Sequence, residues 1–184
     1  MYTDKQKSRL LTAVYAGALC ILCLVLLWCR GTFLAPGHGK TGQWGSLDLE
    51  LTPAGRFCAT AGTETAFASE PGWRVQDFLT GDLDRDGEEE LLLLVWRRGH
   101  YGPSRPFWVD RNDYTYSQHI FIYEQADGTV TPVWMSSTLN PRVKSWSVTG
   151  EGTLRILTPE GEDTRWGWGS WGIERLDAPL RPLV

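Results

Sequence analysis

The pattern of apolar and polar positions divides the chain into two unlike parts. Leu10 to Trp28 is a run of nineteen residues without a charge and without a polar face. A helix of that length spans about 30 Å, the thickness of the hydrocarbon core of a bilayer. From Trp44 onward, short apolar runs alternate with turn signals, and none has the period of a soluble amphipathic helix. The sequence therefore predicts one membrane-spanning helix followed by an all-β region.

The β region has a coarse internal period. Hairpin signals occur at 126–128 (ADG), 149–152 (TGEG) and 169–170 (GS), and about ten short strands are expected. One four-stranded meander runs from Trp73 to Ser136, a shorter one from Val143 to Leu176, and Trp44–Thr60 is part of a third. Such meanders are the blades of β-propellers, which need at least about four of them. We expect meander units of propeller-blade type that form a small incomplete propeller, a barrel or a sandwich.

The flanks of the apolar run indicate its role. A cleaved signal peptide would have a shorter apolar segment and a small-residue cleavage site, which does not follow Trp28, so we predict an uncleaved signal anchor. Three Lys or Arg precede the run, and two, Arg30 and Lys40, follow it within about the 15–20 residues that count for orientation, a small excess that favours a cytoplasmic N-terminus. The predicted organisation is a cytoplasmic tail at 1–9, a transmembrane helix at 10–29 that contacts the lipid bilayer, a Gly-rich tether at 30–43 and an extracytoplasmic β domain at 44–184.

The charge of residues 31–184 limits the classes of partner that this part of the chain is expected to bind. Residues 31–184 carry 14 Lys and Arg against 21 Asp and Glu, a formal charge of −7. An acidic region of this kind indicates neither a nucleic acid nor an anionic membrane surface as its partner. A protein or a glycan outside the cell is the expected partner.

The most specific chemical pattern is DLDRDGEEEL, residues 82–91, between two predicted strands. Carboxylates stand at positions 1, 3, 5 and 9 of this loop, and a glycine at position 6 permits a sharp turn. Oxygen ligands in flexible geometry suit calcium better than magnesium. The loop is not an EF-hand, because position 12 is Leu93 and a strand follows. The alternative is a solvated polar turn, in which crowded carboxylates would repel one another by about a few tenths to one kcal/mol per close pair.

This stretch resembles the FG-GAP or VCBS-type repeat of integrin α-subunit propellers and many bacterial surface proteins, which carries D-x-D-x-D-G-x-x-[DE]-L between two strands. The resemblance covers about one repeat, Trp73 to Ser136. It implies that Ca²⁺ is bound by the side chains of Asp82, Asp84, Asp86 and Glu90 and by the carbonyl of Glu88. The ninth residue is Glu rather than the commoner Asp, and the second meander has TGEG in place of a metal loop, so one site is expected. Since Cys58 is the one cysteine in residues 31–184, this outer region cannot form an internal disulfide, and we expect the ion to stiffen its fold.

A long segment rich in aromatic and Arg residues, 97–118, interrupts the first meander. Loops of this length are often functional, and Trp, Tyr and Arg are enriched at binding hot spots. Tyr101, Phe107 and Trp108 are therefore candidate partner-binding residues. They either stack on a ligand such as a sugar or fill the β core with Arg stacked on them, and the same alternatives apply to Trp166, Trp168 and Trp171.

Catalytic motifs are missing from the sequence. It contains no G-x-S-x-G, no H-E-x-x-H and no phosphate-binding glycine loop, and neither His100 nor His119 stands beside a serine or cysteine in a known arrangement. We therefore expect no enzyme, although a metal-dependent site at the acidic loop is a third hypothesis. The expected function is a membrane-anchored, calcium-binding β domain that mediates surface interaction or adhesion. The alternative is a glycan or cell-wall binding module that uses the aromatic loop at 99–117.

Overall fold

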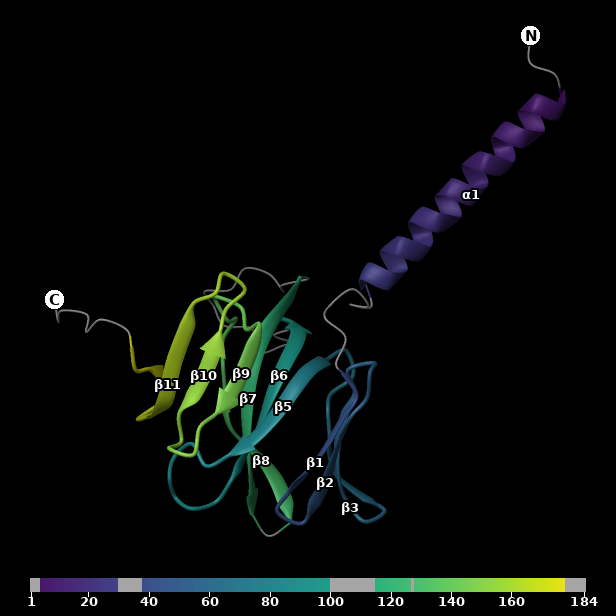
Figure 1. Cartoon of the computed structure of the whole chain (residues 1–184). Helices are drawn as coiled ribbons and strands as arrows, with labels where there is room; N and C mark the ends of the chain where they lie inside the picture. Colours follow the sequence, from purple (N-terminus) through teal and green to yellow (C-terminus); the bar gives the residue numbers. More distant parts are fainter. Residues whose placement is uncertain (1–3, 30–37, 100–114, 127, 178–184) are drawn as a thin grey trace, which may run out of the picture. The chain divides into compact units, whose positions relative to one another are not determined.

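A computed structural model of the chain describes residues 4–29, 38–99, 115–126 and 128–177 (Figure 1). The chain forms two compact units, Met1–Ala35 and Pro36–Val184. The first contains a single helix, α1 (Asp4–Cys29). Its segment Arg9–Leu27 has a mean hydropathy of 2.6 and is long and apolar enough to cross a membrane. A helix of this kind near the N-terminus is compatible with a membrane anchor and with a signal sequence.

The second unit consists of three antiparallel sheets, each built from four strands that follow one another along the chain (Figure 1). The first sheet contains β1 (Lys40–Trp44), β2 (Leu47–Leu51), β3 (Phe57–Ala61) and β4 (Glu64–Ala68). The central sheet contains β5 (Arg74–Gly81), β6 (Glu90–Arg98), β7 (Tyr116–Ala126) and β8 (Thr129–Met135). The third contains β9 (Ser145–Val148), β10 (Leu154–Leu157), β11 (Asp163–Gly169) and β12 (Gly172–Arg175). The all-β prediction is confirmed, and no sheet closes into a barrel among the described strands.

The central sheet is buried on both faces. Leu91 and Leu93 of β6 belong to a core shared with the first sheet, whereas Leu92 and Leu94 belong to a core shared with the third sheet. Successive side chains of a strand point to opposite faces, so a strand that is covered on both sides has no polar position. The continuous apolar run of β6 is therefore explained by its place between two other sheets.

The outer faces of the first and third sheets are polar. In β2 the exposed Asp48 and Glu50 alternate with buried leucines. On the third sheet Arg155 pairs across the strands with Ser147 and Arg165, and all three are exposed. Among the described residues, neither outer face offers a broad apolar surface that a further sheet would have to cover.

The first sheet is more complete than the sequence indicated. β1 begins at Lys40, inside the predicted tether, and pairs with β2 in the register Lys40↔Leu51. β4 lies beyond the predicted end of this unit at Thr60 and pairs with β3. Small and polar residues dominate KTGQW and ETAFA, so these strands lack the apolar alternation by which strands are found in a sequence.

Candidate metal centre

The acidic loop joins β5 to β6 at one end of the central sheet, where Gly81 pairs with Glu90. Two residues of the loop have positive φ angles, Arg85 at 67° and Gly87 at 97°. Glycine adopts such angles without steric cost, whereas an arginine does so only where the surrounding structure holds it. The loop is therefore a tight, defined turn, with the glycine at the position that the sequence indicated.

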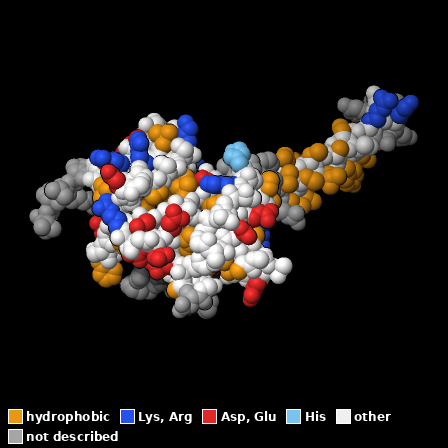
Figure 2. Space-filling view, turned by 60° about the horizontal axis from the view of Figure 1, so that its bottom comes forward, with side chains coloured by type: hydrophobic (Ala, Val, Ile, Leu, Met, Phe, Trp, Pro, Cys, Tyr) orange, Lys and Arg blue, Asp and Glu red, His pale blue; other side chains and the backbone are white. Residues whose placement is uncertain are grey.

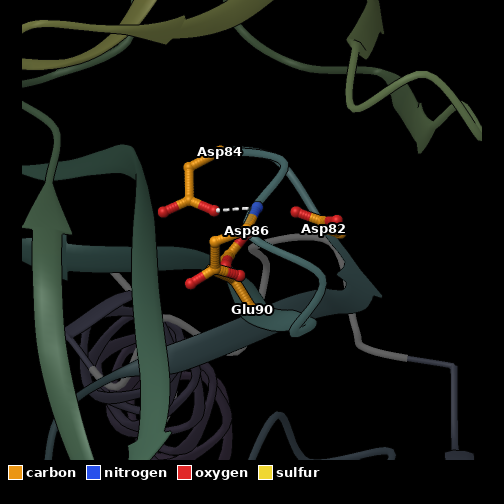
Figure 3. A group of neighbouring side chains, drawn as sticks. All are labelled: Asp82, Asp84, Asp86 and Glu90. Atoms are coloured by element: carbon orange, nitrogen blue, oxygen red, sulfur yellow. Dashed lines mark hydrogen bonds between the residues drawn. The ribbon is translucent and has the colours of Figure 1, made fainter.

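The four predicted side-chain ligands lie together in this turn (Figure 3). One carboxylate oxygen from each of them lies within 4.8 Å of the others; the residues are Asp82, Asp84, Asp86 and Glu90. Two oxygens bound to one calcium ion at about 2.3–2.6 Å are at most about 5 Å apart. The group could therefore hold a metal ion.

Backbone amides of the loop fix the aspartate carboxylates. Asp82 accepts hydrogen bonds from the amides of Arg85 (2.6 Å) and Gly87 (3.1 Å). Asp84 accepts one from the amide of Asp86 (3.1 Å), and Asp86 accepts one from the amide of Glu88 (2.8 Å). Since an ionised carboxylate has about four acceptor sites, these bonds orient the carboxylates and still leave acceptor sites for a cation.

Glu90 differs from the three aspartates because it is buried, with 1% of its surface exposed. Its Oε2 accepts a hydrogen bond from the amide of Leu83 at 2.7 Å. Burial raises the pKa of Glu90 to about 7; the Leu83 amide opposes this shift, and the negative charges of Asp84, Asp82 and Asp86 add to it. A buried carboxylate beside three others requires either a proton or a cation.

Glu88 plays a different part from the four clustered side chains. Its side chain is exposed and does not belong to the carboxylate group. The resemblance assigns it a role through its backbone carbonyl, and that role stays a prediction.

The neighbouring sheets hold the acidic loop from both sides. The indole Nε1 of Trp44, at the end of β1, donates a hydrogen bond to the carbonyl of Glu89. On the other side Gly152, in the β9–β10 turn, has a φ of 68°, and a Cβ added there would lie 2.8 Å from the carbonyl oxygen of Asp82. A groove of about 670 Å³ between loop and turn is lined by Thr80, Gly81, Asp82, Arg85, Glu89 and residues 148–152.

The aromatic candidates differ in where they lie and in how exposed they are. Tyr101, Phe107 and Trp108 lie outside the described residues. Trp166 and Trp168 pack against the core of the central and third sheets. Trp171, by contrast, is 89% exposed in the turn between β11 and β12. The exposure of Trp171 could have been expected from its position directly after the Gly169-Ser170 turn. The sequence alone leaves the same two alternatives for Trp166, Trp168 and Trp171.

The structure also brings a serine to His119, which the sequence analysis did not foresee. His119 Nδ1 lies 3.1 Å from the carbonyl oxygen of Ser136, which can only accept, so in the neutral ring Nδ1 carries the proton. Nε2 then accepts from the hydroxyl of Ser117 at 2.9 Å. Nucleophilic catalysis uses such a pair, but His119 is only 5% exposed and its ring lies 5.8 Å from that of Phe121. We interpret the pair as a buried polar contact of β7.

No family model, curated protein or solved structure matches the chain. The fold and the site define the chain as an all-β protein with an N-terminal apolar helix and one acidic loop that could hold a metal ion. The resemblance to the FG-GAP repeat therefore rests on the ligand spacing and on the position of the loop between β5 and β6.

Proposed function

We propose that the chain is a membrane-anchored protein whose β domain lies outside the cytoplasm, binds calcium at the acidic loop and contacts a partner at the cell surface. The observation that carries the calcium site is the buried Glu90, which lies in one group with Asp82, Asp84 and Asp86. The apolar segment Arg9–Leu27 supports the anchor.

The donor atoms favour calcium over other ions. Four carboxylates, the Glu88 carbonyl and water together supply the six to eight oxygen ligands that calcium takes, at about 2.3–2.6 Å. Magnesium needs a stricter octahedron at shorter distances, and zinc prefers nitrogen and sulfur ligands. The acidic group contains neither His nor Cys.

The proposed role of the ion is structural. The loop is attached to the first sheet through Trp44 and lies against the third sheet at Gly152. The cysteines among the described side chains, Cys20, Cys23 and Cys58, are free, so no disulfide reinforces this arrangement there. An ion that binds only the folded state adds its binding free energy to stability, and an ion in this loop would stiffen the region where the three sheets meet.

We further propose that the three sheets are successive blades of an incomplete propeller. Each sheet has its four strands in sequence order, as propeller blades do, and the sheets follow one another along the chain. The polar outer faces of the first and third sheets support an arc of three sheets rather than part of a larger ring.

Trp171 is the described side chain that best fits contact with a partner. It lies at the tip of the β11–β12 hairpin, on the same end of the domain as the β9–β10 turn and the acidic loop. An exposed indole is a frequent anchor of protein interfaces, and its flat face also stacks on sugars. The second candidate function, a glycan-binding module, is supported by this exposed face.

Calcium binding is tested by thermal unfolding of the whole chain in nanodiscs, with calcium, with magnesium and with a chelator. We expect calcium to raise the melting temperature more than magnesium does, and Asp84→Ala to abolish the calcium effect. If the wild type and Asp84→Ala melt alike in all three conditions, the acidic stretch is a solvated turn and the calcium proposal is wrong.

The partner is sought with the same protein on arrays of soluble glycans and of surface proteins. Trp171→Ala is expected to weaken binding and to leave the melting temperature unchanged, because the indole makes few contacts in the free domain. Binding to glycans alone would favour the second candidate function, and unchanged binding by the variant would exclude Trp171 from the interface.

A further inference from the structure

β1 is an edge strand that buries little of its own surface (Figure 1). It pairs on one side only, with β2. Thr41, Gly42 and Gln43 are exposed, and Trp44 is the one side chain of β1 that is buried in the core. A glycine inside a strand weakens it further, because glycine loses more conformational entropy on folding than other residues do. We therefore expect β1 to depend on contacts outside its own sheet.

Two polar contacts join the ends of β1 to the central sheet and its acidic loop. At the first end, Lys40 forms an ion pair with Asp77 at 2.8 Å and also donates a hydrogen bond to the carbonyl of Phe78. The Nζ atom of Lys40 lies 4.5 Å from the centre of the Phe78 ring. At the last residue of β1, the indole Nε1 of Trp44 donates a hydrogen bond to the carbonyl of Glu89. β1 is thus attached to the neighbouring sheet at both of its ends.

The indole of Trp44 contacts the acidic loop directly beside a predicted ligand. The carbonyl of Glu89 belongs to the same planar peptide group as the amide nitrogen of Glu90, the buried member of the carboxylate group. A pocket of about 310 Å³ is lined by Trp44, Gly45, residues 86–90, Glu124 and Gln125. The end of β1 and the loop are therefore joined by the indole hydrogen bond across an open pocket rather than by close packing.

Negative charge is concentrated in the acidic loop. Residues 82–90 contain six Asp and Glu and a single cation, Arg85. Figure 2 shows acidic side chains gathered on the face of the β domain that is turned forward, with Lys and Arg along its margin. Like charges this close repel one another, so the loop backbone is under strain when no cation is bound. A cation shared by the four clustered carboxylates would remove this repulsion and fix the peptide group to which Trp44 is bonded.

We propose that β1 is a latch on the acidic loop: it stays closed while a cation occupies the loop, and it opens as a unit at the β1–β2 turn when the loop is empty. The inference rests on the proposed calcium site and describes its regulation. Gly45 is the hinge, since its φ of 55° requires the conformational freedom of glycine. Coupling between two sites is reciprocal, so the closed latch raises calcium affinity by the same factor by which calcium favours closure.

Opening of the latch would lengthen the connection between α1 and the β domain. Ten residues, 30–39, lie between α1 and β1, whereas seventeen, 30–46, lie between α1 and β2. Fully extended segments of these two lengths span at most about 36 Å and about 61 Å. In a chain that is anchored through α1, the β domain would therefore reach a partner farther from the anchor when calcium is scarce.

The test is hydrogen exchange of the whole chain in nanodiscs, measured by mass spectrometry in calcium and in chelator. We expect the amides of residues 41–46 to exchange faster in chelator than in calcium. β10 is the internal reference, because it lies inside the third sheet and exchanges when the whole domain opens. The increase in exchange rate at β1 should exceed the increase at β10 by at least about fivefold.

Two indole variants separate the latch from general stability. Trp44→Phe keeps an aromatic ring but removes the N–H that bonds the acidic loop, and Trp166→Phe removes an N–H that bonds within β11. We expect Trp44→Phe to exchange rapidly at β1 even in calcium and to bind calcium at least about fivefold more weakly in isothermal titration. Trp166→Phe should behave as the wild type in both measurements. Lys40→Met removes the ion pair at the other end of β1 and is expected to act in the same direction if Trp44→Phe fails to fold.

The remaining outcomes contradict the proposal and distinguish the latch from the calcium site. If calcium raises the melting temperature but slows exchange at β1 and β10 equally, the site exists and the latch does not. Rapid exchange at β1 in Trp44→Phe with unchanged calcium affinity would also overturn the latch, because the coupling has to be reciprocal. If calcium changes neither the melting temperature nor any exchange rate, the calcium site itself is wrong, and the latch with it.

Discussion

At the scale of single residues, Glu90 carries the chemistry of the site. It is buried, it accepts a hydrogen bond from the Leu83 amide, and it lies among three other carboxylates. These surroundings disfavour its charged form unless a cation is present. We therefore expect Glu90 to weaken the domain when no metal is bound and to strengthen it when a metal is bound.

Replacing Glu90 by Gln separates these two effects. Gln keeps the shape and an acceptor for Leu83 but removes the buried charge, so without metal at pH 8 we expect Glu90→Gln to raise the free energy of unfolding by about 1–3 kcal/mol. With calcium the order reverses, because the variant lacks one charged ligand. Denaturant unfolding with and without chelator measures both. Glu88→Gln removes an exposed charge from the same loop and is the control; a similar response of both variants would contradict the role of Glu90.

The raised pKa of Glu90 also predicts how stability depends on pH. Without metal the folded protein holds the proton up to a pKa of about 7, whereas the unfolded chain releases it near 4.5. Rising pH between these values therefore favours the unfolded chain. In chelator, the melting temperature of the wild type should fall relative to that of Glu90→Gln as the pH rises from 5 to 8. A constant difference between the two proteins across this range would show that Glu90 does not titrate there.

The candidate ligands could be predicted from the sequence because they lie within one short loop. Their assignment as ligands depends only on their spacing in the sequence. The structure brings together the side chains of Asp82, Asp84, Asp86 and Glu90. The burial of Glu90 could not be predicted, because it arises from the packing of distant strands. The contact of Ser117 with His119 was missed because the strand predicted around His119 began at Gln118, whereas β7 begins at Tyr116 and so places Ser117 on the same strand face as His119.

At the scale of elements, the β9–β10 turn and the acidic loop form one contact. Gly152 lies against the backbone of Asp82, and a Cβ added at Gly81 would lie 2.6 Å from the Cγ1 of Val148. Two glycines from different sheets therefore permit the close approach of the third sheet to the acidic loop.

Gly152→Ala tests this contact. The added methyl group would meet the Asp82 carbonyl at 2.8 Å and the backbone has a positive φ, so we expect a loss of about 1–3 kcal/mol in unfolding free energy and weaker calcium binding. Isothermal titration and chemical unfolding measure the two effects. Gly150→Ala, in the same turn but with open space around it, is the control. Normal calcium affinity in a destabilised Gly152→Ala would mean that the turn does not shape the site.

Elements with regular apolar alternation were found in the sequence, and those without it were not. The meanders that contain the central and third sheets were predicted, and the three hairpins expected at 126–128, 149–152 and 169–170 are confirmed. β1 and β4 are held by pairing with β2 and β3 rather than by their own composition, so their sequences gave little sign of them.

At the scale of the whole molecule, stability depends on the central sheet. One face of β6 and β7 packs against the third sheet through Leu92, Leu94, Ile120 and Ile122. The other face of the same strands packs against the first sheet. The sequence predicted the three units but not their stacking, because the stacking depends on contacts between residues that are far apart in the chain.

Leu94→Ala is expected to lower the free energy of unfolding by about 2–5 kcal/mol, because it opens a cavity between the central and third sheets. Leu176→Ala, which truncates a leucine that is 56% exposed, should change it by less than about 1 kcal/mol. Thermal or chemical unfolding of both variants provides the measurement. Similar losses would show that the third sheet is not packed on the central sheet as described.

The two apolar faces of the central sheet also impose an order on biogenesis. The chain is synthesised from the N-terminus, so the first sheet is available to cover one face of the central sheet as soon as that sheet forms. The second face stays bare until residues 145–175 emerge, and during this interval it is a surface on which unrelated chains can aggregate. A nascent chain that stalls before residue 145 should thus need a chaperone, whereas one that has passed residue 175 should not.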